Sequence, residues 1–346
     1  MIYNRSLQDD YLSHKGDEDD LIPFLLGRNA INYLIDSLEI EAIILPTYIC
    51  SMVVDIFKHY KIEVFFYENL NKKLEIPLSD ILIQVGEVKC SKKLFFLWHD
   101  YLNIVGDMPD ELYYYLEKSG IEVVIDATHS LPVKKYKSQN VVYGFRKLLN
   151  QPFGSLLKIN QKQSKPLNEM SFIKLLKFLS FHKVSTYIYS TYSGVNNNWI
   201  NRLLKILSTY GERFSFDKHN IFLYDKYNYK KIIVKHNSLD YEKISQKRRR
   251  NFLQYSSLSS SQLNLNNFDI SCPYGFPLIV EDNKQIRKKL WEMGVHSFIL
   301  WDTLHEDVSL KETKDSNYLS NSNLILPVNQ DLSLNDIDKI LNILNV

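Results

Sequence analysis

Two residues in the first half of the chain are of types that can do chemistry, and both lie close to apolar segments. Asp126 begins the segment D-A-T-H-S directly after the apolar run 122–125, and Lys147 lies in Y-G-F-R-K-L-L. A carboxylate just after a strand is well placed to face a ligand at the carboxyl edge of a parallel sheet, but it can equally cap a helix or turn. An isolated lysine is most often solvated. Neither residue alone therefore defines a site.

The elements predicted around these residues alternate between strands and helices. Residues 28–39 place apolar side chains at helical spacing, and Gly27 lies at their start. Short apolar runs typical of buried strands recur along the first half; we predict strands at 41–45, 62–67, 93–98, 122–125, 141–143 and 154–159, and further helices at 51–60 and 109–119. This alternation predicts a mostly parallel sheet with helices on both faces. Asp126 would then lie at the edge where such sheets bind ligands.

The second half of the chain predicts a smaller α+β domain. The low-complexity segment 256–267 (SSLSSSQLNLNN) is predicted to be a surface loop. After it, 277–280 has a strand pattern, and 284–293 and 332–344 have helical patterns. We predict an α/β protein with a large domain over 1–205 and a small carboxyl-terminal domain over 206–346.

The composition is that of an ordinary soluble globular protein. The 346 residues are 45% hydrophobic and 24% charged, with a net charge of +2. Such a charge gives no general attraction to nucleic acid or membranes, so any anion site must be local. The polar, acidic start argues against a secretory signal, and no apolar run approaches the ~18–20 residues of a membrane helix. We therefore expect a cytoplasmic protein without nucleic-acid or membrane partners.

Several other reactive-looking segments favour structural interpretations. The three cysteines are far apart and form no CxxC pair, so neither a disulfide framework nor a zinc knuckle is predicted. The acidic run 17–20 is typical of a solvated tail, and no metal site is expected. The segment Trp98-His99-Asp100 follows a strand and could line a pocket, although a structural histidine is favoured there. The basic cluster 247–250 (KRRR) could bind phosphate, and no aromatic platform for nucleic acid accompanies it.

Taken together, several short segments resemble the DegT/StrS family of sugar aminotransferases. D-A-T-H-S, Y-G-F-R-K and F-G-S-L-L are similar to the cofactor region of the branch that carries an S-x-R-K signature. Gly27-Arg28-Asn29-Ala30 is similar to the family's phosphate-binding turn, and Leu45–Cys50 to the following strand and loop. Trp301 and Leu324–Val328 match a late tryptophan and strand. The resemblance implies the type I fold of transferases that depend on pyridoxal 5'-phosphate (PLP).

The resemblance also implies roles for individual residues. Lys147 would carry the cofactor covalently and move protons, which requires a lysine that can be neutral near pH 7. Asp126 would pair with the pyridine nitrogen and keep it protonated. His129 takes the place of a glutamine near the ring hydroxyl. The amides around Gly27, Arg28 and Asn29 would hold the phosphate at a helix start, and Cys50 takes the position of the ring-stacking aromatic.

Three positions depart from the family's pattern. Cys50 cannot stack on the cofactor ring as an aromatic side chain does. Gly144 stands where a hydroxyl residue is expected three positions before the lysine, so one phosphate ligand is missing. His129 in place of glutamine alters the contact with the ring hydroxyl. These departures belong either to a variant of the family or to a chain with weakened cofactor binding.

The function implied by the resemblance is transfer of an amino group, with glutamate as the expected donor, to a keto-sugar nucleotide. Such an enzyme serves surface-polysaccharide or related amino-sugar synthesis, and we expect a homodimer. An anionic substrate needs local positive charge, for which Arg146, Arg248 and Arg249 are candidates, with Trp301 as a further substrate-binding residue. Two alternatives stay open: a small phosphorylated ketone as the substrate, and a cofactor-poor homologue that serves as a binding or scaffold protein.

Overall fold

The computed structural model describes eight stretches of the chain, namely residues 21–24, 26–132, 136–149, 154–159, 239–258, 268, 271–308 and 313–344. The predicted boundary between 205 and 206 lies outside these stretches, as does most of the predicted loop 256–267. Within the described part, no helix is long and apolar enough to cross a membrane.

A seven-stranded sheet forms the first half of the molecule, as the alternating pattern predicted. Its strands lie in the order β1-β7-β6-β5-β4-β2-β3. Only β7 runs antiparallel to its neighbours, and the other adjacent pairs are parallel. The strands are β1 (Ile22–Phe24), β2 (Ala42–Pro46), β3 (Glu63–Tyr67), β4 (Leu94–His99), β5 (Glu122–Ala127), β6 (Asn140–Tyr143) and β7 (Ser155–Lys158).

The central strands are buried because their side chains are apolar on both faces. Every residue of β2 is buried, and so are all but the first residues of β4 and β5. This is the pattern of a parallel sheet that helices cover on both sides. The helices described in this half are α1 (Gly27–Leu38), α2 (Ser51–His59), α3 (Leu78–Glu87), α4 (Asp110–Lys118) and the short α5 (Phe145–Leu149).

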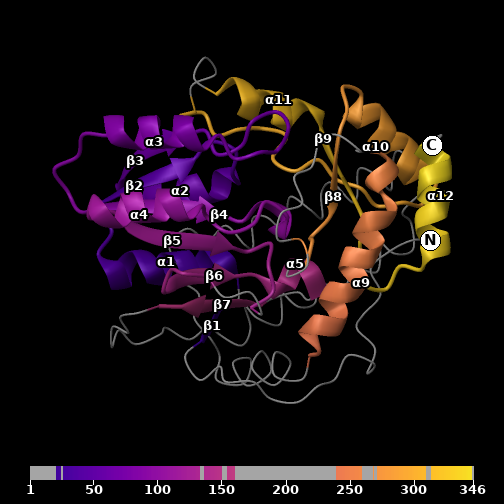
Figure 1. Cartoon of the computed structure of the whole chain (residues 1–346), viewed down its shortest axis with the longest axis horizontal. Coiled ribbons are helices and arrows are strands. Elements are labelled where there is room, and N and C mark those ends of the chain that lie inside the picture. Colours follow the sequence, from indigo (N-terminus) through magenta and orange to yellow (C-terminus); the bar gives the residue numbers. More distant parts are fainter. Residues whose placement is uncertain are drawn as a thin grey trace.

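The second half has its own sheet and its own core. The strands β8 (Phe276–Ile279) and β9 (Asn323–Leu326) pair antiparallel, and a second cluster of buried apolar side chains surrounds them. Among the residues that the structure describes, four helices accompany these strands: α9 (Tyr241–Gln254), α10 (Asn283–Glu292), α11 (Lys314–Ser322) and α12 (Leu334–Leu344). In Figure 1 the large sheet and α1 to α4 lie on one side of the molecule, α9, α10 and α12 lie on the other with β8 and β9, and α5 lies between them.

Candidate active site

The carboxyl ends of the parallel strands and the starts of α1 and α2 surround a cavity. Its volume is about 230 Å³. Its walls come from strand ends, helix starts and one loop of the second half: Leu26, Gly27, Arg28, Ile31, Cys50, Met52, Val53, Ile56, His99, Asp126, Thr128, Gly144, Lys147, Gly154 and Trp301. This is the edge at which parallel sheets bind ligands. The cavity brings together Asp126 and Lys147, the two residues whose types and positions in the sequence indicate chemistry.

Asp126 is held in place by its neighbour on the adjacent strand. His99 and Asp126 lie opposite each other in the parallel pairing of β4 with β5. His99 Nδ1–H donates a hydrogen bond to Asp126 Oδ2 over 3.0 Å, and the backbone N–H of Thr128 donates to Oδ1 over 3.0 Å. Both side chains are almost completely buried. The carboxylate therefore has a fixed orientation at the wall of the cavity.

The charge state of Asp126 follows from these contacts. Burial alone would raise the pKa of the carboxyl group. The charge and hydrogen bond of His99, with further contributions from Lys147 and Thr128, outweigh burial and lower the pKa of Asp126 to about 2. The cavity therefore contains an ionised carboxylate at neutral pH, which suits a positively charged ligand group.

This lowered pKa predicts a pH dependence of stability. The pKa of the folded state, about 2, lies below the ordinary value of 3.8. Asp126 then contributes about 2 kcal/mol to the free energy of unfolding above pH ~4, and the contribution is lost as the pH falls toward 2. Urea unfolding of the wild type and Asp126→Asn between pH 6 and pH 3 measures it. The stability difference between the two proteins should shrink as the pH falls, and a constant difference would contradict the assignment.

Lys147 enters the cavity from α5, which follows the end of β6. Its side chain is half-buried and lines the cavity together with Asp126. Its positive charge contributes to lowering the pKa of both Asp126 and His129. An amine that shares a cavity with an ionised carboxylate can serve as a nucleophile and as a carrier of protons.

His129 lies behind the cavity and does not line it. The ring is fully buried, and burial, followed by the charges of Lys147 and His99, lowers its pKa well below the ordinary value. Its Nδ1 accepts a hydrogen bond from the backbone N–H of Leu102 over 3.3 Å, so the neutral ring carries its proton on Nε2. Nε2 has no hydrogen-bond partner among the described residues. Trp301 and Tyr274 stack with this ring.

The start of α1 forms one end of the cavity. Gly27 and Arg28 line it, and Asn29 is buried beside them. Leu26, the residue before the helix, provides no side-chain cap, and the first turn contains no acidic residue. The first amides of a helix lack acceptors within the helix and carry partial positive charge. This end of the cavity is therefore suited to an anion.

Trp301 closes another side of the cavity from the second half of the chain. Its backbone has a positive φ of 52°, which is uncommon for a residue with a side chain. The indole packs edge-on against His99 and Tyr48, at ring centroid distances of 5.1 and 5.0 Å. Further along the same loop, Asp307 pairs with Lys58 of α2. The loop is thus attached to the helix that forms the neighbouring wall.

Two of the three arginines predicted to bind substrate, Arg248 and Arg249, do not line this cavity. Arg248 is fully buried, and its guanidinium donates to the carbonyl oxygens of Pro273 and Tyr274 and to the side chain of Gln330. Arg249 donates to the carbonyl oxygen of Ser271 and pairs with Glu242. These contacts give both arginines packing roles in place of the predicted substrate contacts. Arg146 belongs to α5, and its side chain lies outside the described part.

Two residues of the cavity were missed or undervalued in the sequence. The sequence favours a structural role for His99, whereas in the structure it orients Asp126 and lines the cavity. Thr128 lines it as well. In the sequence, His99 is a histidine at the end of a predicted strand. Its contact with Asp126 could be predicted only if the pairing of β4 with β5 in this register were known.

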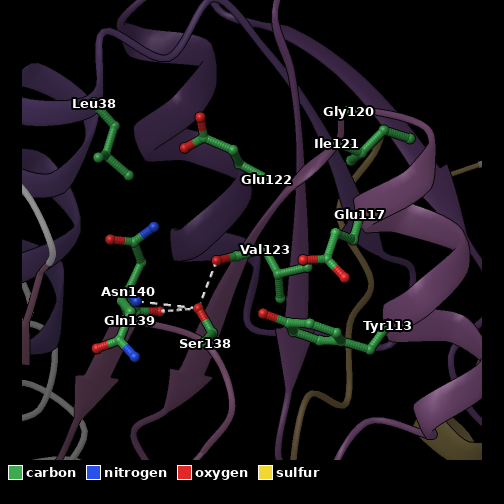
Figure 2. A pocket seen from close by; sticks show the side chains of 10 residues that line it. All are labelled: Leu38, Tyr113, Glu117, Gly120, Ile121, Glu122, Val123, Ser138, Gln139 and Asn140. Carbon is green, nitrogen blue, oxygen red and sulfur yellow. Dashed lines mark hydrogen bonds between the residues drawn. The ribbon is translucent and has the colours of Figure 1, made fainter.

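A second cavity lies at the opposite edge of the sheet. Figure 2 shows it near the starts of β5 and β6, with Glu122, Asn140 and Ser138 among the labelled side chains. It is larger, about 410 Å³. Its lining contains no lysine, arginine, histidine or cysteine, and the carboxylate of Glu122 pairs with Lys93. The first cavity therefore has the better set of reactive groups.

Comparison with known proteins shows which fold this is. Neither a protein-family model nor a curated protein sequence matches the chain. Among solved structures, a DegT/DnrJ/EryC1/StrS aminotransferase from Brucella abortus matches with a TM-score of 0.63 at 12% identity, over 94% of this chain and 85% of that one. A proposed sugar aminotransferase from Streptococcus pneumoniae, in its PLP form, matches with a TM-score of 0.63 at 13% identity, over 93% and 85%.

A third match is a sugar aminotransferase from Micromonospora echinospora, with a TM-score of 0.61 at 11% identity, over 94% of this chain and 86% of that one. The chain therefore has the fold of these aminotransferases, which confirms the fold that the resemblance implied.

Proposed function

We propose that this chain is a PLP-dependent aminotransferase whose cofactor occupies the cavity at the carboxyl edge of the large sheet. The observation that carries the proposal is that Lys147 and the buried, ionised Asp126 line one cavity that begins at the start of α1. Solved structures with the same fold are aminotransferases, and one of them is in its PLP form.

The residues of the cavity fit the cofactor at three points. Lys147 offers a primary amine for the aldehyde. Asp126 offers a carboxylate for the pyridine nitrogen, and its low pKa keeps it ionised. The start of α1 offers backbone amides for the phosphate. The cofactor-poor alternative is not favoured, because these three groups are present together in spite of the departures at Cys50 and Gly144.

Each residue then has a defined task. When bound, PLP supplies an electron sink that stabilises negative charge next to the reacting carbon. Asp126 keeps the proton on the ring nitrogen, and His99 holds Asp126 in the orientation that this requires. Lys147 would hold the cofactor through its amine and would move a proton between the two carbons that exchange it. His129, buried behind Trp301, supports the wall of the site.

We further propose that the amino acceptor is a keto-sugar nucleotide and that glutamate is the donor, in surface-polysaccharide or related amino-sugar synthesis in the cytoplasm. The support is that two of the matching solved structures are described as sugar aminotransferases. Arg28 and Trp301 line the cavity and are the substrate-binding candidates that the described residues offer. We also propose a homodimer, which light scattering would test against the monomer mass of 40.8 kDa.

A panel of keto compounds tests this function. The purified protein is loaded with PLP, converted with glutamate to its amino form, and mixed with nucleotide-diphosphate keto-sugars or with small keto-phosphates. We expect at least one keto-sugar nucleotide to restore the absorption spectrum of the PLP form. Restoration by a small keto-phosphate alone would contradict the sugar-nucleotide proposal and favour the other substrate class. Failure of every ketone would contradict the aminotransferase proposal itself.

A further inference from the structure

The phosphate end of the proposed site lacks the hydroxyl group that the resemblance places three residues before Lys147. That position is Gly144, and the packing explains why. A Cβ added there would lie 2.5 Å from the carbonyl oxygen of Thr128 and 2.9 Å from its Cα. These atoms belong to backbone fixed by strand pairing, since Ala127 pairs with Tyr143. A serine at 144 would force the ends of β5 and β6 apart, so the hydroxyl cannot come from this position.

Thr128 places a hydroxyl-bearing side chain in the same corner of the cavity. It lines the cavity together with Gly27 and Gly144. A Cβ added at Gly27 would lie 2.9 Å from the Cγ2 of Thr128, so the threonine side chain packs directly against the start of α1. Within the described part of the chain, Thr128 makes its hydrogen bond through its backbone N–H, to Asp126 Oδ1. No described residue is a hydrogen-bond partner of its side-chain hydroxyl.

The start of α1 presents the complementary donors. The amides of Asn29 and Ala30 already donate to the carbonyl oxygen of Leu26, so the donors at this end are the backbone amides that precede them, at Gly27 and Arg28. No side chain caps the helix. The amides at such a start favour an anion, and a hydroxyl beside them adds a neutral donor. Thr128 stands next to Gly27 at this start and next to Gly144 on the other side. The methyl group Cγ2 is the part of Thr128 that faces Gly27, so an anion bound at the start of α1 would lie beside this side chain.

We propose that Thr128 supplies, through Oγ1, the hydroxyl ligand of the cofactor phosphate in place of the side chain that Gly144 cannot carry. This inference rests on the proposed function. Gly144 and Thr128 then depend on each other. The backbone of Thr128 excludes a side chain at position 144, and the side chain of Thr128 supplies the hydroxyl donor that position 144 lacks. The departure at Gly144 is then a relocated ligand and not a sign of lost cofactor binding.

Two substitutions at Thr128 separate the effect of its hydroxyl group from the effect of its side-chain shape. Thr128→Val removes the hydroxyl and keeps the branched shape, whereas Thr128→Ser keeps the hydroxyl. The affinity of the cofactor-free protein for PLP, and for pyridoxal as a probe without phosphate, is measured by absorption titration. A hydrogen bond to a charged group accounts for about 10- to 100-fold in affinity. We expect Thr128→Val to weaken PLP binding by that factor, Thr128→Ser to retain it, and pyridoxal to bind all three proteins equally.

Each outcome decides the matter. Wild-type affinity for PLP in Thr128→Val, while the wild type binds PLP, would overturn the inference and leave the proposed function standing. An equal loss of PLP and pyridoxal would also overturn it, because the side chain would then only shape the cavity. A wild type that binds no PLP would overturn both proposals. If Thr128→Val does not fold, the comparison of Thr128→Ala with Thr128→Ser tests the same point. In a separate experiment, Gly144→Ser should be less stable than the wild type and should not bind PLP more tightly.

Discussion

Replacement of Lys147 with alanine should lower the rate of amino transfer by at least about 1,000-fold. General acid–base catalysis alone contributes roughly 10²–10⁴-fold, and the substitution also removes the covalent anchor of the cofactor. The amine lies half-buried in the cavity that contains Asp126. The measurement is the rate at which glutamate converts the PLP form of the protein to its amino form, followed by absorption spectroscopy under single-turnover conditions.

Lys93, which directly precedes β4, provides the matched control. Lys93 pairs with Glu122 at the opposite edge of the sheet, and its side chain is half exposed. Lys93→Ala should leave the rate unchanged, because a surface ion pair of this kind contributes little to stability. Comparable rates in Lys147→Ala and the wild type would show that another group does the chemistry.

Asp126→Asn should cut turnover by at least about 100-fold while the cofactor still binds. The loss of an electrostatic stabiliser in a closed site costs roughly 10²–10³-fold. An amide cannot hold a proton on the ring nitrogen as the ionised carboxylate of Asp126 does, and the carboxylate stays ionised because its pKa is about 2. Turnover and PLP affinity are measured on the same preparation, so that a fall in rate is separated from a loss of cofactor.

Asp110→Asn is the control for this substitution, because Asp110 is exposed at the start of α4 and pairs with Lys137. It should leave both turnover and PLP affinity at wild-type values. If Asp126→Asn kept full turnover, Asp126 would be reduced to a structural residue that fixes the turn through the N–H of Thr128.

Most of the large sheet could be predicted from the sequence, because apolar residues in its strands and helices recur at the spacings typical of these elements. The apolar runs at 41–45 and 122–125 correspond to β2 and β5, and the helical spacing over 28–39 corresponds to α1. The short strand β1 and the helix α9 were not predicted. β1 has only three residues, and α9 is rich in charged residues, so neither has a distinct apolar pattern.

The site was harder to predict than the fold, since its geometry depends on contacts between distant segments. Asp126 and Lys147 were found from their positions next to apolar segments and from the family resemblance. The role of His99 depends on the pairing of β4 with β5, which the sequence does not show. Arg248 looked like an anion ligand, but its guanidinium is fully buried among backbone carbonyl groups. A cluster of basic residues in the sequence does not show which of their side chains will be buried in the folded protein.

The central claim, that this cavity holds PLP on Lys147, is tested most directly by locating the cofactor on the chain. The purified protein is incubated with PLP, reduced with borohydride and digested, and the modified peptide is identified by mass spectrometry. We predict a visible absorption band before reduction and, after it, a stoichiometric cofactor adduct on the peptide that contains Lys147. No visible band, or an adduct spread over surface lysines with Lys147 unmodified, would contradict the claim.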